Sequence, residues 1–583
     1  MQDSTIAYFS MEMCLDHSIP TFSGGLGVLA GDTLRSAADL GLPMVGVTLL
    51  HRTGYFDQTI DAAGNQTERP ALWQPEDLLD QMPTRVSIEI EGRRVRVRPW
   101  RYVVRGVNSH EVPVYLLDTA LPENSDFDRT LTDNLYGGDN HYRLCQEVVL
   151  GMGGAAMLRV LGYLGDVRYH INEGHPALLT LTLLARQLSG RALEDVNDAD
   201  LEVVRRQCIF TTHTPVPAGH DKFPLTMVRK VLGQKHTQLL EAAGCTERGE
   251  LNMTLVGLRL SRYSNGVAMR HREVSQGMFP SYDIEAVTNG VHATTWTSEP
   301  FRELFDRRIP EWRNDNLYLR YAVNVAADEI LEAHARAKTI MIEDVARRSG
   351  VRLDPKAMTI GFARRATQYK RADLIFTDVE RLKRIAADHG PIQIVFGGKA
   401  HPNDSGGKDL IRHIFEAAAA LKNAVRVIYL ENYDMLLAQS LIPGVDLWLN
   451  NPTKPLEASG TSGMKASLNG VPSLSVLDGW WVEGHIEGVT GWSIGSSDEP
   501  VADSRVDAND LYLKLEQKIL PLFYGRANSY VQVMRSAIAL NGSFFNTQRM
   551  VRQYMHNAYF PSTDGAGVAG RISLRPKGTA IGV

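Results

Sequence analysis

Short apolar segments alternate with helical patterns through the second half of the chain. Each segment is long enough for one buried strand but too short for a buried helix, and such unbroken apolar runs are typical of strands covered on both faces of a parallel sheet. Strands are predicted at residues 358–363, 392–396, 425–430, 445–449 and 473–477. Helices are predicted between them at residues 372–388, 408–421 and 435–441. This alternation predicts a doubly wound parallel sheet.

The first half repeats the pattern with one interruption. Strands are predicted at residues 6–10, 42–50, 167–175 and 207–215, and helices at residues 33–40, 142–162 and 176–188. Residues 81–115 instead alternate apolar and polar side chains, which indicates an antiparallel excursion from the sheet. We therefore expect an α/β protein with a first lobe over residues 1–295 and a second lobe over residues 296–545.

Helical patterns also follow the last predicted strand. They occupy residues 511–524, 530–540 and 547–554. The third unit, residues 546–583, is expected to hold a helix that crosses back to the first lobe. Its end, from Pro561 onward, is rich in glycine and is expected to be a flexible tail.

The composition excludes several classes of protein. The 583 residues are 44% hydrophobic and 22% charged, which is ordinary for a globular protein with a large core. The formal net charge of -5 at pH 7 gives no reason to expect nucleic acid or a membrane as a partner. The four cysteines are widely spaced, so we expect neither disulfides nor a metal site. Without an apolar spanning run or a signal-peptide pattern, a cytoplasmic location is expected.

One loop has the composition of an anion site. It joins the predicted strands 445–449 and 473–477 and reads Glu457-Ala-Ser-Gly-Thr-Ser-Gly-Met-Lys465. Its glycines let backbone N–H groups point at an anion, and a helix beginning at Met464 would add a partial positive charge. Read alone, the loop could equally be the capped start of a helix.

Further polar residues fall where α/β proteins bind ligands. Glu173, His175 and His213 follow predicted strands, and open parallel sheets bind ligands at the carboxyl ends of their strands. A structural role is as common for such histidines. The glycine-rich residues 22–32 could form a second anion cradle or a tight turn. The basic residues 364–371 follow a strand and could be either a binding site or a solvated face.

The string from Glu457 to Gly470 resembles the pyridoxal-phosphate site of the glycogen/α-glucan phosphorylase family. That family usually reads Thr-Gly-Asn-Met-Lys where this chain has Thr-Ser-Gly-Met-Lys. Other strings between Gly24 and Asn469 are similar to those of the family and occur in the same order. The chain looks most like the short bacterial and archaeal branch, without the regulatory extension of animal members, so we expect no need for AMP. The resemblance implies a GT-B fold, in which two Rossmann-like lobes face each other across a cleft.

The resemblance also implies roles for individual residues. Lys465 would carry pyridoxal phosphate, and Arg365 and Lys370 would hold the substrate phosphate. Glu457 and His213 would contact the reacting sugar. Further cofactor-binding residues would be Gly460, Thr461, Ser462 and Tyr433. Further substrate-binding residues would be Gly24, Gly25, Glu173, His175, Asn289, Ser459 and Tyr369. The His-Glu pair of the family is Thr367 and Gln368 here, which leaves the hydrogen bonds around the basic run open.

The activity implied by the resemblance is phosphorolysis. Orthophosphate would cleave the terminal α-1,4 bond of an α-glucan or maltodextrin and give α-glucose 1-phosphate with retention, with the cofactor phosphate as acid and base. A homodimer is possible. One alternative is a nucleotide-sugar transferase, but such enzymes commonly carry a second glutamate eight residues after the first, where this chain has Lys465. Another is a non-catalytic glucan-binding relative, which the changed residues near Lys370 and Lys465 keep open.

Overall fold

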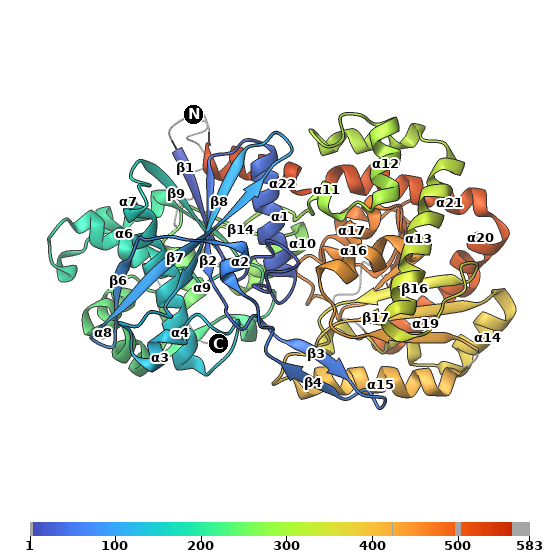
Figure 1. The fold of residues 1–583 in the computed structure, drawn as a ribbon, viewed down its shortest axis with the longest axis horizontal. Helices are drawn as coiled ribbons and strands as arrows, with labels where there is room; N and C mark the ends of the chain where they lie inside the picture. Colours follow the sequence, from blue (N-terminus) through green and yellow to red (C-terminus); the bar gives the residue numbers. More distant parts are fainter. Residues whose placement is uncertain (1–3, 423, 496–502, 562–583) are drawn as a thin grey trace, which may run out of the picture.

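The computed structural model describes residues 4–422, 424–495 and 503–561. Two large sheets lie side by side in this part of the chain, each packed among helices, and two small antiparallel sheets accompany them (Figure 1). We call the surroundings of the first sheet the first lobe and those of the second sheet the second lobe. The predicted α/β class with parallel sheets is confirmed. The expected tail after Pro561 lies outside the described residues.

The first sheet has ten strands, in the order β15-β14-β10-β9-β1-β2-β8-β7-β5, with β6 paired to β7. Its parallel strands are β1 (Ser4–Phe9), β2 (Met44–Leu49), β8 (Glu111–Asp118), β9 (Asp166–Asn172), β10 (Cys208–Thr211), β14 (Tyr263–Gly266) and β15 (Glu285–Ala286). Every residue of β2 is buried, as expected for a strand with helices on both faces. The helices of this lobe include α1 (Gly25–Asp39), α4 (Asn140–Val148), α5 (Gly154–Val160), α6 (Leu179–Leu188), α7 (Asp198–Gln207), α8 (Leu225–Ala242), α9 (Met253–Arg259) and α10 (Met269–Met278).

The predicted antiparallel excursion is present. It consists of β5 (Asp80–Gln81), β6 (Val86–Ile90) and the long β7 (Arg93–Arg105), which pairs antiparallel to β8. Buried and exposed residues alternate along β6, which is the pattern of a sheet with one covered face.

A second, smaller hairpin was not predicted. Its strands are β3 (Asp57–Ile60) and β4 (Gln66–Arg69), and it leaves the first lobe to lie against α15 (Ser405–Leu421) of the second lobe (Figure 1). Its sequence is polar, so it carries no hydrophobic period. Contacts with the other lobe hold it in place instead.

The second sheet is fully parallel, in the order β18-β17-β16-β19-β20-β21. Its strands are β16 (Met358–Ala363), β17 (Ile392–Gly397), β18 (Arg426–Leu430), β19 (Leu447–Asn450), β20 (Ser473–Val476) and β21 (Gly491–Ile494). This is the order of a doubly wound sheet, and the connections reverse direction between β16 and β19. Ligands bind at such a switch point, so the loops after β16 and β19 are the expected site.

Several predicted helices begin elsewhere than expected. The helix predicted at residues 33–40 is α1 and begins at Gly25, because Gly27 and Gly31 let it pack closely: a Cβ on Gly31 would lie 2.0 Å from the Cys14 carbonyl oxygen. The helix predicted at residues 372–388 is α14 (Val379–His389), which begins late because the Asp378 carboxylate caps its first turn. The other helices that accompany the second sheet include α11 (Ala293–Trp296), α12 (Glu299–Arg308), α13 (Ala327–Ser349), α16 (Met435–Gly444) and α17 (Ser462–Leu468).

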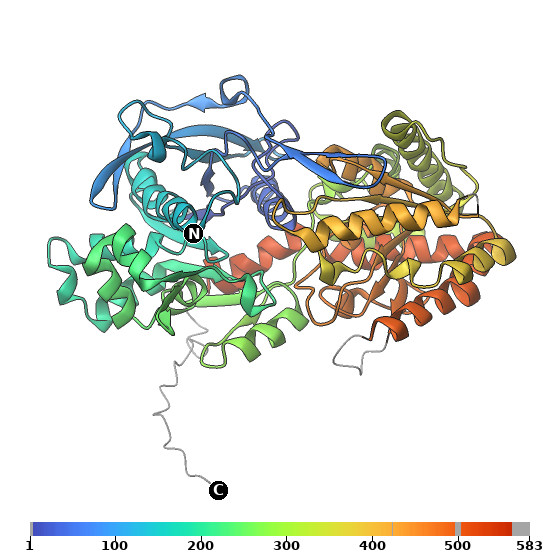
Figure 2. The same cartoon turned by 90° about the horizontal axis from the view of Figure 1, so that it is seen from below.

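The C-terminal helices return to the first lobe. The helix predicted from residue 511 already begins at Ser504, as α19 (Ser504–Lys514), and is followed by α20 (Leu520–Gly525) and α21 (Ala527–Ser536). The last, α22 (Thr547–Tyr554), packs against α1, and its Met550 and Val551 join the hydrophobic core of the first lobe. Figure 2 shows these C-terminal helices passing from the second lobe to the first.

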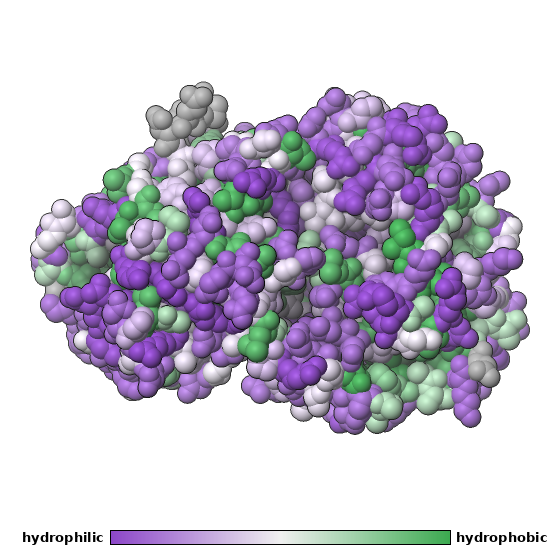
Figure 3. All heavy atoms as spheres, viewed as in Figure 1, coloured by the Kyte–Doolittle hydropathy of each residue, from purple (hydrophilic) through white to green (hydrophobic). Residues whose placement is uncertain are grey.

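The face shown in Figure 3 is mostly hydrophilic, with scattered apolar side chains. Among the described residues, no helix combines the length and the apolar character needed to cross a bilayer.

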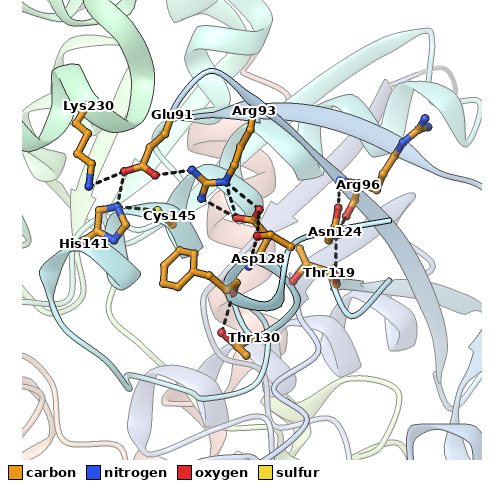
Figure 4. Close-up of polar contacts among 12 residues, drawn as sticks. Glu91, Arg93, Arg96, Thr119, Asn124, Asp128, Thr130, His141, Cys145 and Lys230 are labelled. Carbon is orange, nitrogen blue, oxygen red and sulfur yellow. Dashed lines mark hydrogen bonds and ion pairs between the residues drawn. The ribbon is translucent and has the colours of Figure 1, made fainter. Parts of the chain in front are cut away.

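A network of charged side chains connects the turn between β6 and β7 to helices α4 and α8 (Figure 4). Glu91, in the β6–β7 turn, accepts hydrogen bonds from Arg93 and His141 and pairs with Lys230 at 3.0 Å. Arg93 also reaches Asp128 at 2.7 Å. Partial burial would raise the pKa of Glu91, but the hydrogen bonds from His141, Lys230 and Arg93 outweigh it and lower the pKa to about 2.

This network predicts a pH-dependent contribution to stability. The folded-state pKa of Glu91 lies below its unfolded value of 4.5, so its contribution is present above about pH 4.5 and is lost as the pH falls toward 2. Glu91→Gln is expected to cost about 1–2 kcal/mol at pH 7, since the site is partly solvated. Urea unfolding of both proteins between pH 7 and pH 3 should show this difference shrinking. A constant difference would contradict the assigned charge interaction.

Candidate functional site

One cavity of about 710 Å³ lies between the two lobes, at the carboxyl ends of both sets of strands. Every residue that the sequence analysis assigned to the site lines it. The structure therefore brings together strings that are hundreds of residues apart in the sequence. Their contacts decide which chemistry each can perform.

Glu457 is held by two cations at the switch point of the second sheet. Arg364, directly after β16, places Nη2 2.5 Å from Glu457 Oε2, and Lys370 Nζ lies 2.6 Å from the same oxygen. All three side chains are largely buried. Burial alone would raise the pKa of Glu457, but the charges of Arg364 and Lys370 lower it to about 2. The Glu457 carboxylate is thus ionised at neutral pH and lies between two basic side chains.

Lys465 lies across the cavity on α17. The residue is 7% exposed, and its ammonium sits 3.5 Å from the centroid of the Trp296 ring. Burial lowers the pKa of this ammonium from 10.5 to about 8, against the smaller opposing effect of Asp32. An amine whose pKa is lowered this far is partly available as a nucleophile near neutral pH.

The loop before Lys465 differs from the expectation in one detail. The helix begins at Ser462, two residues before the predicted start at Met464, and the Ser462 hydroxyl accepts a hydrogen bond from Trp448 Nε1. Gly460 has φ +87°, which only glycine adopts without strain. The Ser459 hydroxyl is buried without a hydrogen-bond partner, so a polar atom near the cavity is left for a ligand.

The glycine-rich stretch of the first lobe is not an empty anion cradle. The carboxylate of Glu12 accepts hydrogen bonds from the backbone N–H groups of Ser23 at 2.5 Å and of Gly24 at 3.2 Å, and from the hydroxyl of Tyr136 at 3.0 Å. A Cβ on Gly24 or Gly25 would meet open space, so these glycines border the cavity without close packing. An anion bound here would therefore lie beside the Glu12 carboxylate and would need a cation from the other lobe.

Arg365 supplies that cation. Its side chain is exposed to the cleft, and its Nη2 approaches the Ser23 hydroxyl of the first lobe at 3.4 Å. Unlike Arg364 and Lys370, which share Glu457, Arg365 forms no ion pair among the described residues. Of the three cations, Arg365 is the one best placed to meet an anion that enters the cleft.

The polar residues after β9 and β10 form a connected group. His213 Nε2 lies 2.7 Å from the Asn172 amide oxygen, which can only accept, so this nitrogen carries the hydrogen. Glu173, at a strained φ of +70°, accepts hydrogen bonds from the His213 N–H and the Thr214 hydroxyl. Burial lowers the pKa of His213 to about 3, so it is neutral at pH 7. Glu173 thus shapes the loop that presents His213.

His175 and Asn289 complete the wall of the first lobe. His175 lies 3.3 Å from Asp221, which also pairs with Arg143. The side-chain oxygen of Asn289 is buried without a partner. Arg549 of α22 donates to the Asn289 carbonyl at 3.0 Å, so the returning helix holds this loop in position. Tyr369 and Tyr433 line the second-lobe side of the cavity, with Thr461 and Gly460.

Sequence reasoning missed several residues of the site. Arg364 was read only as part of a basic run, and its pairing with Glu457 depends on the order of strands in the second sheet. Glu12, Tyr136 and Asp221 belong to no string that the analysis used, and Lys399 belongs to the matched string 397–400 but was given no role, yet all four line the cavity. Glu12 had one available signal, since a carboxylate between a strand and a glycine-rich stretch is a natural partner for its N–H groups.

The fold and this cleft define a two-lobed α/β protein with a cationic site that faces a buried lysine. Comparison with known proteins identifies its class: residues 235–492 match the family model described as carbohydrate phosphorylase. The chain is 40% identical to the maltodextrin phosphorylase of Thermococcus litoralis, over 98% of this chain and 72% of that protein. It is 37% identical to the glycogen phosphorylase of Aquifex aeolicus (95% and 86%) and 36% identical to that of Mycobacterium tuberculosis (96% and 71%). The chain belongs to the carbohydrate phosphorylase family.

Proposed function

We propose that this chain is a pyridoxal-phosphate-dependent α-glucan phosphorylase with a GT-B arrangement of lobes at residues 1–295 and 296–545. It would cleave the terminal α-1,4 bond of a glucan or maltodextrin with orthophosphate and release α-glucose 1-phosphate. The observation that carries the proposal is the cleft itself, where the Glu457 cluster and Arg365 face the buried amine of Lys465. A cytoplasmic location and a homodimer remain predictions.

The cavity fits the cofactor by its donor set. Lys465 offers a buried amine of lowered pKa, Ser459 offers a hydroxyl without a partner, and Gly460 offers a backbone with no side chain in the way. Lys465, Gly460, Thr461, Ser462 and Tyr433 would hold pyridoxal phosphate. When bound, it would supply a phosphate group that can donate a proton and take it back.

The residues of the chain would do the rest. Arg365 and the Arg364–Lys370 pair would bind orthophosphate and offset its charge. His213 and Asn289 would orient the terminal sugar, and Glu457 would hold its hydroxyls. The bond between the sugar C1 and the leaving oxygen would break, the leaving oxygen would receive the proton that orthophosphate gives up, and a phosphate oxygen would bond to C1 on the same face. Closing the sugar between the lobes would exclude water, which would otherwise hydrolyse the bond.

Two alternatives are weaker. A nucleotide-sugar transferase would need a group for the nucleotide ribose at position 465, where a lysine now stands against Trp296. A non-catalytic glucan-binding protein would not need the buried Arg364–Glu457–Lys370 cluster, because keeping three charges out of water is costly without a function or a precise partner.

The test of the proposed function is product analysis. The protein loaded with pyridoxal phosphate is incubated with maltoheptaose and orthophosphate, and ³¹P NMR follows the products. We expect α-glucose 1-phosphate to appear in the same amount as orthophosphate disappears. Glucose without its phosphate ester would indicate a hydrolase, and transfer that occurs only with a nucleotide sugar would establish the transferase.

Arg365 and Lys370 are expected to differ on substitution. Arg365→Ala should raise the KM for orthophosphate about ten- to a hundredfold, because a charge-assisted contact is worth about 1.5–3 kcal/mol, with little change in Tm. Lys370→Ala should lower Tm as well, because it removes a counter-ion of buried Glu457. Steady-state kinetics and thermal unfolding separate the two. Arg365→Lys, which keeps the charge, is the matched control, and wild-type kinetics in Arg365→Ala would show that Arg365 does not bind phosphate.

A further inference from the structure

We propose that the β3–β4 hairpin positions the phosphate-binding side of the cleft, and that Gln58 and Gln66 are its positioning residues. The hairpin is an arm of the first lobe that reaches the loop after β17 in the second lobe (Figure 1). That loop, residues 397–400, lies beside the basic run that begins at Arg364. The inference rests on the proposed function, because it concerns how that site is held in place.

Gln66 binds the second lobe as a neighbouring strand would. Its side-chain oxygen accepts from the Ala400 N–H at 3.0 Å, and its amide nitrogen donates to the Ala400 carbonyl at 2.8 Å. The side chain is 7% exposed. Both backbone groups of one buried loop residue are thus satisfied by a single side chain from the other lobe.

Gln58 makes the second part of this connection. Its amide nitrogen donates to the Gly398 carbonyl at 2.9 Å and to the Gln66 side-chain oxygen at 2.7 Å, and its own oxygen accepts from the Asn432 N–H at 2.8 Å. Gln58 is 2% exposed. Buried amide networks in which every group is paired are stiff, because breaking any member leaves an unsatisfied polar group.

The loop that these glutamines hold is joined to the basic run by its backbone. The Arg364 N–H donates to the Gly397 carbonyl at 3.0 Å, and the Ala366 N–H donates to the Lys399 carbonyl at 3.0 Å. The two segments also touch closely: a Cβ on Gly398 would lie 1.8 Å from the Arg364 carbonyl oxygen. The loop and the start of the basic run therefore move together.

Apolar packing supports the same connection. Ala366 of the basic run, Ala400 of the loop and Ile411 of α15 form a small buried cluster, and Ile60 of the hairpin packs against it. Lys399 adds a hydrogen bond from its ammonium to the Phe56 carbonyl at 2.8 Å. The first lobe thus reaches the backbone that carries both Arg364 and Arg365.

This connection would fix the distance between Arg365 and the first-lobe loop that faces it. Arg365 must meet the Ser23–Gly24 loop of the first lobe, and the hairpin ties these two lobes together next to that meeting point. His213 and Asn289, which would orient the sugar, lie on loops of the first lobe and do not depend on this connection. Loosening the hairpin should therefore weaken phosphate binding and leave glucan binding unchanged.

The test compares two faces of the same hairpin. Gln58→Ala/Gln66→Ala removes the inward network, while Thr59→Ala/Thr67→Ala removes only a pair of outward hydroxyls that contact each other at 2.6 Å. We expect the inward variant to raise the KM for orthophosphate about tenfold, with the KM for maltoheptaose within about twofold of wild type, and the outward variant to match wild type. Gln66→Glu keeps the acceptor for the Ala400 N–H but places a carboxylate where the amide donates to the Ala400 carbonyl at 2.8 Å and to Glu68 at 2.7 Å, and should shift the KM for orthophosphate at least as far in the same direction.

Calorimetric titration of orthophosphate into each protein repeats the comparison without turnover. A purely structural hairpin would lower Tm in the inward variants and leave both the KM for orthophosphate and the calorimetric affinity unchanged, and this result would overturn the proposal. Equal rises in both KM values would also overturn it. A wild-type protein that binds orthophosphate but forms no glucose 1-phosphate would contradict the proposed function alone.

Discussion

Lys465→Met is expected to abolish cofactor retention and phosphorolysis while leaving the protein as stable as the wild type or more so. The Lys465 ammonium is buried against an aromatic ring, and burial lowers its pKa to about 8, so the charged form is held at a cost in the folded protein. Methionine fills a similar volume without that charge. The measurements are the absorbance spectrum after gel filtration with pyridoxal phosphate, the rate of glucose 1-phosphate formation, and Tm.

Lys338 provides the matched control for this substitution. It is also a buried lysine, 5% exposed, but it donates to Asp446 at 2.6 Å and to the Ala357 carbonyl at 2.8 Å, away from the cavity. Lys338→Met should lower Tm and keep the cofactor, which is the opposite pattern. If Lys465→Met retained the cofactor absorbance and full activity, Lys465 would not be the attachment site.

Glu457→Gln is expected to lower kcat at least about a hundredfold while the KM for orthophosphate stays the same or falls. The carboxylate would hold the reacting sugar, so its loss slows the reaction. The same change frees the charges of Arg364 and Lys370, which now share Glu457 Oε2, and these cations would then attract phosphate more strongly. Kinetics with each substrate varied in turn separate the two effects.

The control for Glu457 is an ion pair outside the cleft. Glu516 pairs with Arg381 at 2.8 Å on the surface of the second lobe, and Glu516→Gln should leave both kinetic constants unchanged. A wild-type kcat in Glu457→Gln would show that the carboxylate serves only to balance the two cations.

Most strands of the two large sheets were predictable from the sequence because they are apolar runs, but the polar β14 and the short β15 were not. β16 and β17 are fully buried, and every residue of both lies within or next to a predicted strand. β21 (Gly491–Ile494) was missed, since Gly491 and Ser493 interrupt its apolar character. It pairs with β20 as the edge of the sheet, and that partner is visible only in three dimensions.

The β3–β4 hairpin shows where sequence patterns fail. Gln58 and Gln66 are buried although they are polar, because groups of the other lobe, more than 300 positions away, satisfy them. A local pattern cannot contain that information. The start of α1 was predicted wrongly for a related reason. Glycine is a poor helix former, but Gly31 is required where the helix meets the Cys14 carbonyl.

The sequence predicted which residues belong to the candidate site, but it did not predict which of them contact one another. The strings named residues that all line one cavity, but the sequence did not show that Lys370 shares Glu457 with Arg364, or that Glu12 already accepts hydrogen bonds from the glycine-rich stretch. These contacts follow from the order of strands at the switch point and from the meeting of two lobes. The roles of the site residues remain predictions until they are tested by substitution.

The most direct test of the proposed site is the position of the cofactor on the chain. The protein is loaded with pyridoxal phosphate, reduced with borohydride and digested, and the peptides are mapped by mass spectrometry. We expect a single pyridoxyl adduct, on Lys465, in the peptide that continues to Asn469 and Gly470. An adduct on any other lysine, or active protein in which Lys465 carries none, would contradict the assignment of this cleft as the cofactor site.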